Sequence, residues 1–97
     1  MPVYISLYRW TDQGIKNVKN SPARLEAGLK AAEAMGIKSI GTYITMGQYD
    51  LITIGEAPNE ETIAMFALAI GAQGNVHTET LRAFTTEEFH QIVDALP

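Results

Sequence analysis

The sequence predicts a single α+β domain in which strands and helices follow one another in the order β-α-β-β-α-β, with a further helix at the C-terminus. Three observations lead to this fold class. A run rich in β-branched and aromatic residues occupies Val3–Trp10, two similar runs flank Gly47-Gln48, and stretches with helix caps separate these runs. A chain of 97 residues has room for one hydrophobic core, so we expect one domain over residues 1–97.

The first strand is expected at Val3–Trp10, and its two faces differ in character. Val3, Ile5 and Leu7 point to one side and are all aliphatic. The other side carries aromatic and polar side chains, namely Tyr4, Ser6, Tyr8 and Trp10. We therefore expect the aliphatic face to pack on the helices and the aromatic face to be left for solvent or a partner.

The first long helix is expected at Pro22–Met35, after a short polar turn over residues 11–18. Ser21 suits the N-cap position, and Pro22 suits the first helical position, where a missing N–H costs no hydrogen bond. Gly36 follows at the place where a helix commonly ends in a left-handed residue.

The middle of the chain, Ile37–Ala57, predicts a β-hairpin. Its strands are expected at Thr42–Met46 and Tyr49–Ile54, on either side of Gly47-Gln48. Gly at the first central position is typical of a two-residue type II′ turn, because that residue needs a positive φ.

The second half of the chain predicts a helix, a strand and a last helix. Asn59 can cap a helix at about Glu60–Gln73, and Asn75–Phe84 has strand character. Thr85 with Glu88 forms a capping box that opens the last helix. The apolar stripe of that helix consists of Phe89, Ile92, Val93 and Leu96.

This element order is the split βαβ pattern of the ferredoxin-like fold. Right-handed crossovers then place the strands in the order 4-1-3-2, fully antiparallel, with the two long helices on one face.

Several short motifs give the chain a resemblance to a known family. The first is Gly47-x-Tyr49-Asp50 at the hairpin. The others are Thr11-Asp12-Gln13-Gly14-Ile15, Ser21-Pro22-x-Arg24, Glu56-Ala57-Pro58, Gly74-Asn75-Val76 and Thr78-Glu79-Thr80-Leu81-Arg82-Ala83-Phe84. With these motifs the chain resembles the GYD family over nearly its whole length. The resemblance implies a ferredoxin-like domain that pairs face to face into a dimeric α/β barrel, as a homodimer or higher homo-oligomer, and implies no particular activity.

The face expected to be free supplies the candidate ligand site. Two such faces brought together would enclose a partly polar cavity for a small molecule, or their side chains would simply fill the interface. The candidate ligand-binding residues are Tyr4, Tyr8, Trp10, Tyr43, Thr53, Thr80 and Arg82. Ser6, Ser39, Gly41, Gly55 and Thr78 are expected on the same face, unless a β-bulge inverts part of a strand. A charged residue in place of Trp10 would then be the most damaging surface change.

The hairpin motif Gly47, Tyr49 and Asp50 has a catalytic and a structural interpretation. Tyr49 could act as an acid and Asp50 as a base. Alternatively, Gly47 sets the turn, Tyr49 packs on a neighbouring strand, and Asp50 accepts hydrogen bonds from turn amides or from Arg24 or Arg82.

Composition excludes several functional classes. The chain has no cysteine and a net charge of −4, which argues against disulfides, thiol nucleophiles and nucleic-acid binding. His77 and Glu79 share a strand face, but His90 lies on a helix, so no metal site and no cofactor are expected. No segment has the length of a membrane span, and we expect a soluble, cytoplasmic protein.

Two functions remain open from the sequence. The first is a homodimeric protein that binds a small molecule or serves as an accessory protein without catalysis. The second is a cofactorless enzyme similar to the small oxygenases and isomerases built as dimeric barrels, acting in the sheet-face cavity. In that case Arg82→Ala or Tyr43→Phe would abolish turnover while the dimer survives.

Overall fold

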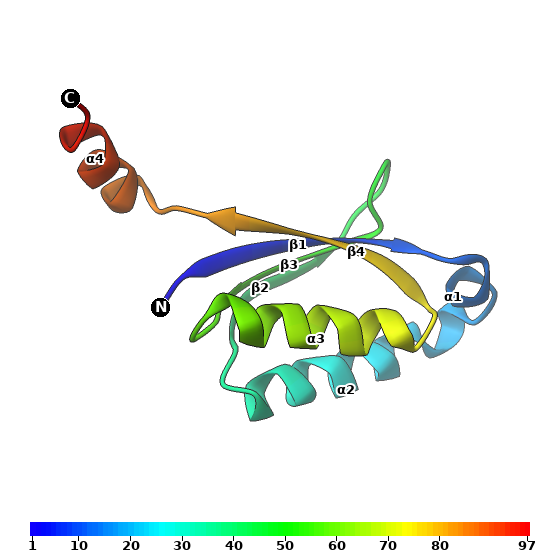
Figure 1. Ribbon diagram of the computed structural model, residues 1–97. Coiled ribbons are helices and arrows are strands. Elements are labelled where there is room, and N and C mark those ends of the chain that lie inside the picture. The colour runs from blue at the N-terminus through cyan, green and yellow to red at the C-terminus, as the bar shows by residue number, and fades with distance from the viewer.

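The computed structural model describes residues 1–97 and has one four-stranded sheet with two long helices on one of its faces (Figure 1). The elements are β1 (Val3–Trp10), α1 (Asp12–Lys16), a 3₁₀ turn (Val18–Asn20), α2 (Ser21–Ala34), β2 (Lys38–Ile44), β3 (Leu51–Glu56), α3 (Glu60–Ala72), β4 (Val76–Ala83) and α4 (Thr86–Asp94). Helix α4 follows β4 at the end of the chain and stands away from the body of the domain (Figure 1).

The strand order is β2-β3-β1-β4, and every neighbouring pair is antiparallel. This is the predicted order 4-1-3-2 viewed from the other edge, so the ferredoxin-like fold is confirmed. Strand β1 lies in the centre and pairs along its length with both β3 and β4.

The helix caps explain where the helices begin. The Asn59 side chain accepts a hydrogen bond from the Thr62 N–H at the start of α3. At α4, Thr85 and Glu88 bond to each other's backbone N–H groups, as the capping-box pattern predicts. Helix α2 begins at Ser21, one residue before the predicted start, so Ser21 is not the N-cap, and Asn20 before it forms no side-chain cap hydrogen bond.

The hairpin differs from its prediction in the length of the loop. Strand β2 ends at Ile44 and β3 begins at Leu51, so the two-residue turn is wrong. The loop closes through the Thr45 N–H, which donates to the Asp50 carbonyl at 2.9 Å. Gly47 has φ of 105°, so its expected left-handed backbone is present within this longer loop.

The face of the sheet that the helices cover is the opposite of the predicted one. Tyr4, Ser6 and Tyr8 are buried under α2 and α3, with exposed fractions of 4–7%. Tyr4 joins Ala32, Ile37 and Ala57 in the core. The alternation of residues along β1 separated its two faces correctly but did not show which face packs against the helices. The aromatic rings offer more area to bury than the aliphatic side chains, and here they form the inner face.

The aliphatic face is therefore the uncovered one. In register, Ile5 lies between Ile54 of β3 and Leu81 of β4, and Leu7 lies beside Ile52. Leu81 is 44% exposed. No helix covers this side of the sheet (Figure 1).

A β-bulge explains one more difference. The pairing of β2 with β3 shifts between Ser39 and Gly41. Ser39 stays in register with Gly55 on the helix side, whereas Tyr43 pairs with Ile52 and lies on the uncovered face, 61% exposed.

Candidate functional site: a cavity between sheet and helices

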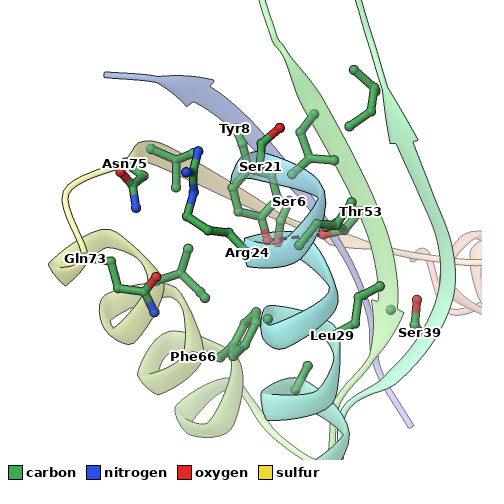
Figure 2. A pocket seen from close by; sticks show the side chains of 18 of the residues that line it. Ser6, Tyr8, Ser21, Arg24, Leu29, Ser39, Thr53, Phe66, Gln73 and Asn75 are labelled. Atoms are coloured by element: carbon green, nitrogen blue, oxygen red, sulfur yellow. Dashed lines mark hydrogen bonds between the residues drawn. The ribbon is translucent and has the colours of Figure 1, made fainter. Parts of the chain in front are cut away.

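A cavity of about 530 Å³ lies between the sheet and helices α2 and α3. Side chains from all three elements point into it, among them Ser6 and Thr53 from the sheet, Leu29 from α2 and Phe66 from α3 (Figure 2). Its lining is mainly apolar, and its volume falls within the roughly 300–1,000 Å³ of small-molecule sites.

Four of the seven candidate ligand residues line this cavity: Tyr4, Tyr8, Trp10 and Thr53. The Tyr8 hydroxyl lies 3.3 Å from the Thr53 hydroxyl, which orients both groups on the sheet. This cavity lies within the single chain, between its sheet and its helices, whereas the cavity predicted from the sequence would lie between two facing sheets.

The other three candidate residues do not line the cavity. Tyr43 lies on the uncovered face of the sheet, for the reason given above. Thr80 lies on β4, where its hydroxyl is 3.5 Å from that of Ser6.

Arg82 makes its contacts near the start of α4 and not in the cavity. Its guanidinium lies 4.5 Å from the Phe84 ring centroid and 5.7 Å from that of Tyr4. It also donates to the Ala83 carbonyl and lies 3.8 Å from the Glu88 carboxylate. The hydrogen bond from the Thr85 N–H, with a smaller contribution from Arg82, lowers the pKa of Glu88. Arg82 thus links β4 to the α4 cap.

One end of the cavity is closed by two of the motifs that carry the family resemblance. Thr11 donates its N–H to the Asn75 carbonyl at 3.0 Å and its hydroxyl to the Gly74 carbonyl at 2.6 Å. The Gln13 side chain donates to the Gln73 carbonyl and the Asn75 side chain. The segments around residues 11–15 and 73–76, distant in sequence, form one polar junction.

Gly14 is required at this junction. A Cβ on Gly14 would overlap the Asn75 carbonyl group, so no other residue fits without a backbone shift. Sequence reasoning singled out this glycine only as part of a motif.

Arg24 is the functional candidate that sequence reasoning missed, since it was considered only as a partner for Asp50. It extends from α2 into the cavity, toward the end where Asn75 lies (Figure 2). Its guanidinium donates to the Asn17 carbonyl at 2.9 Å and to the Gly14 carbonyl at 3.5 Å. Its place on the same helical stripe as Leu25 and Gly28 is the signal that could have found it.

The hairpin motif ties the loop to the sheet. The Asp50 carboxylate accepts from the Trp10 N–H at 2.9 Å, and the Asp50 N–H donates to the Tyr8 carbonyl at 2.8 Å. Asp50 therefore bonds to the backbone of β1 and not to Arg24 or Arg82, the two arginines considered as alternative partners. The Tyr49 hydroxyl donates to the Glu79 carboxylate of β4 at 2.8 Å. These contacts match the structural interpretation of the motif.

The Tyr49–Glu79 contact also changes the pKa of Tyr49. The hydrogen bond to Glu79 is the main cause that raises the pKa of Tyr49 above its ordinary value of 10.0. The neutral phenol donates to a carboxylate, and its ionisation would break that bond and place two negative charges together.

No group of three or more potential ligands among His, Asp and Glu could hold a metal ion. His77 lies on the uncovered face in register with Arg9, and Glu79 bonds to Tyr49. None of the helices is long and apolar enough to cross a membrane.

Comparison with known proteins shows which family the chain resembles and supports its fold. The model of the GYD domain matches residues 4–93. A protein of Thermus thermophilus named "Glutamine synthetase and cystathionine beta-lyase binding protein" is 31% identical over 84 residues, which cover 86% of this chain and 88% of that protein.

Among solved structures, the chain is similar to the crystal structure of FFRP-DM1, with a TM-score of 0.62 and 19% identity. The match covers 87% of this chain and all of that chain. At this level of identity the similarity shows the fold.

Proposed function

Since this chain belongs to the GYD domain family, we propose that it is a homodimeric accessory protein that binds a metabolic enzyme in the cytoplasm. The observation that carries the proposal is the uncovered aliphatic face of the sheet, which includes Ile5, Leu7 and Leu81. A contiguous apolar patch on a sheet face commonly marks a surface that another protein covers.

The surface that best fits against this face is the same face of a second copy of the chain. The central strands β1 and β3 carry aliphatic side chains on this face, and the edge strand β4 adds Leu81 beside the polar Glu79 and His77. Two copies related by a two-fold axis would bring identical patches together, which is the commonest arrangement of soluble homo-oligomers. The dimer of the GYD resemblance pairs through its sheets in this way.

Such a dimer leaves the apolar stripe of α4 as a separate surface for the enzyme. Phe89 is 59% exposed and Ile92 is 46% exposed on this helix. Glu87 and Asp94 add negative charge beside the stripe. A complementary surface would therefore be an apolar groove with a basic rim, a common way for one protein to hold an amphipathic helix of another.

The relative from Thermus thermophilus supports the choice of client, since its name records binding to glutamine synthetase and cystathionine β-lyase. We therefore expect the chain to bind at least one of these two enzymes, taken from its own source organism.

Isothermal titration of the chain into each purified enzyme tests the proposal. We expect saturable binding to at least one enzyme, weakened about tenfold or more by Ile92→Asp, because that change places a charge in the apolar stripe. Gln91→Asp adds the same charge off the stripe and should bind like the wild type. Absence of binding to both enzymes contradicts the proposed client, and equal loss in both variants contradicts the role of the α4 stripe.

A further inference from the structure

The cavity between the sheet and the helices is lined by a single charged side chain. Arg24 is the only charged residue among those that line it, and no acidic residue is among them. The rest of the lining is dominated by aliphatic and aromatic side chains, with a few hydroxyl and amide groups. A partly buried cation without a nearby anion is complementary to a negatively charged group.

The hydrogen bonds of Arg24 leave room for such a group. Its guanidinium carries five N–H donors, and the protein supplies two carbonyl acceptors, those of Asn17 and Gly14. Neither acceptor is charged, and Arg24 forms no salt bridge. The two carbonyls hold the guanidinium at the end of the cavity, while donors remain for a ligand.

The opposite part of the cavity is suited to an apolar body. Leu29 and Phe66 lie there from α2 and α3 (Figure 2), and Ile63 and Ile70 of α3 also line the cavity. Tyr4 also lines the cavity, and its buried hydroxyl has no hydrogen-bond partner in the protein. An unpaired buried hydroxyl of this kind costs stability unless another molecule bonds to it.

We propose that this cavity binds a small monocarboxylic acid with an apolar chain or ring, whose carboxylate pairs with Arg24. Guanidinium and carboxylate groups match in a two-bond geometry, and the apolar body replaces water in contact with Phe66 and Leu29. This site lies within one subunit, so it needs neither the dimer nor an enzyme client and goes beyond the function proposed above.

Trp10 provides a direct probe, because it is the only tryptophan of the chain and lines the cavity. The experiment titrates the full chain with decanoate and, separately, with decan-1-ol, while the fluorescence of Trp10 is recorded. The two compounds share a chain length and differ in charge. We expect saturable binding of one decanoate per chain, about tenfold or more tighter than decan-1-ol, because only the carboxylate pairs with Arg24.

Two variants locate the binding. Gly28 lines the cavity from α2, and a Cβ there would meet only the Ile70 side chain, at 3.8 Å. Gly28→Leu should fill the cavity and abolish the Trp10 response, whereas Ala27→Leu, on the exposed side of α2, should bind decanoate normally. Arg24→Gln should remove the preference for decanoate over decan-1-ol, whereas Lys30→Gln, which removes an exposed cation from the same helix, should keep it.

The comparison of the two compounds on the wild-type chain does not depend on the folding of any variant. Equal affinities for decanoate and decan-1-ol would overturn the role of Arg24. An unsaturable response, or unchanged decanoate binding by Gly28→Leu, would overturn the site itself.

Discussion

At the scale of single residues, Gly14 is the glycine that leaves the least space for a side chain. A side chain there would collide with the backbone of Asn75, across the junction that closes one end of the cavity. We expect Gly14→Ala to lower the free energy of unfolding by about 3 kcal/mol, because the collision is with backbone and cannot be relieved by a rotamer change. Urea unfolding followed by circular dichroism measures this loss.

Gly71 is the matched control, since it is also a helical glycine and a Cβ there would meet no atom within 4 Å. Gly71→Ala should raise the free energy of unfolding by about 0.5–1 kcal/mol through helix propensity. If the two substitutions have similar effects, the close approach of Gly14 to Asn75 does not constrain the fold.

The same junction shows what sequence reasoning can find at this scale. The motifs around Thr11 and Gly74 stood out in the sequence, but nothing in their spacing showed that they meet. Arg24 had a detectable signal, a cation on an otherwise apolar helical stripe, which is easily taken for a surface residue whose aliphatic stem packs on the core. Its role depends on the cavity, and a cavity is a property of packing in three dimensions.

At the scale of elements, the loop between β2 and β3 is held by two side chains. Asp50 bonds to the backbone of β1, and Tyr49 reaches Glu79 of β4. The motif therefore links the loop to the central strand β1 and to the edge strand β4. The two-residue turn was predicted from Gly47 and from the strand-like runs that flank Gly47-Gln48, whereas the hydrogen bonds of Asp50 hold a longer loop.

The Tyr49–Glu79 bond predicts a pH dependence. Because the pKa of Tyr49 is raised in the folded chain, this bond stabilises the fold fully below the ordinary tyrosine pKa of 10.0, and its contribution is lost as the pH rises through the raised value. We expect Glu79→Gln to lower the pKa of Tyr49. Tyrosine ring-carbon NMR measures it, with the Tyr49 signal assigned from Tyr49→Phe.

Glu88→Gln serves as the control for this titration, since Glu88 belongs to the cap of α4. It should leave the pKa of Tyr49 unchanged. A Tyr49 pKa that stays the same in Glu79→Gln would mean that the hydrogen bond does not govern the titration.

The elements themselves were the most predictable part of the fold. Caps such as Asn59 and Thr85 act locally, so sequence spacing locates them, and the strand alternation of β1 separated its two faces correctly. The choice of face was wrong because it depends on what covers each side of the sheet. The bulge between Ser39 and Gly41 then moved Tyr43 to the other face, which spacing alone does not show.

At the scale of the whole molecule, the domain has a small interior for its length. Only seven of its 97 residues are buried. The helices cover the aromatic face of the sheet, and the aliphatic face has no cover within the chain (Figure 1). Small domains with limited cores commonly gain stability by self-association, so a dimer through the aliphatic face would complete the core.

Leu7→Glu tests this dimer. Leu7 lies on the central strand of the uncovered face, so a carboxylate there would be buried without a partner in the dimer and exposed to water in the monomer. We expect the wild-type chain to sediment as a dimer at micromolar concentration and Leu7→Glu to sediment as a folded monomer. Trp10, the sensitive position if the aromatic face formed the interface, lies on the helix side, and a charge there should disturb the cavity before the dimer.

Ala27→Glu is the control, because it adds the same charge on the exposed side of α2 and should remain dimeric. A wild-type chain that sediments as a monomer would contradict the dimer. A dimeric, folded Leu7→Glu would place the interface elsewhere, and the exposed stripe of α4 would then become the first surface to test, by sedimentation of Ile92→Asp.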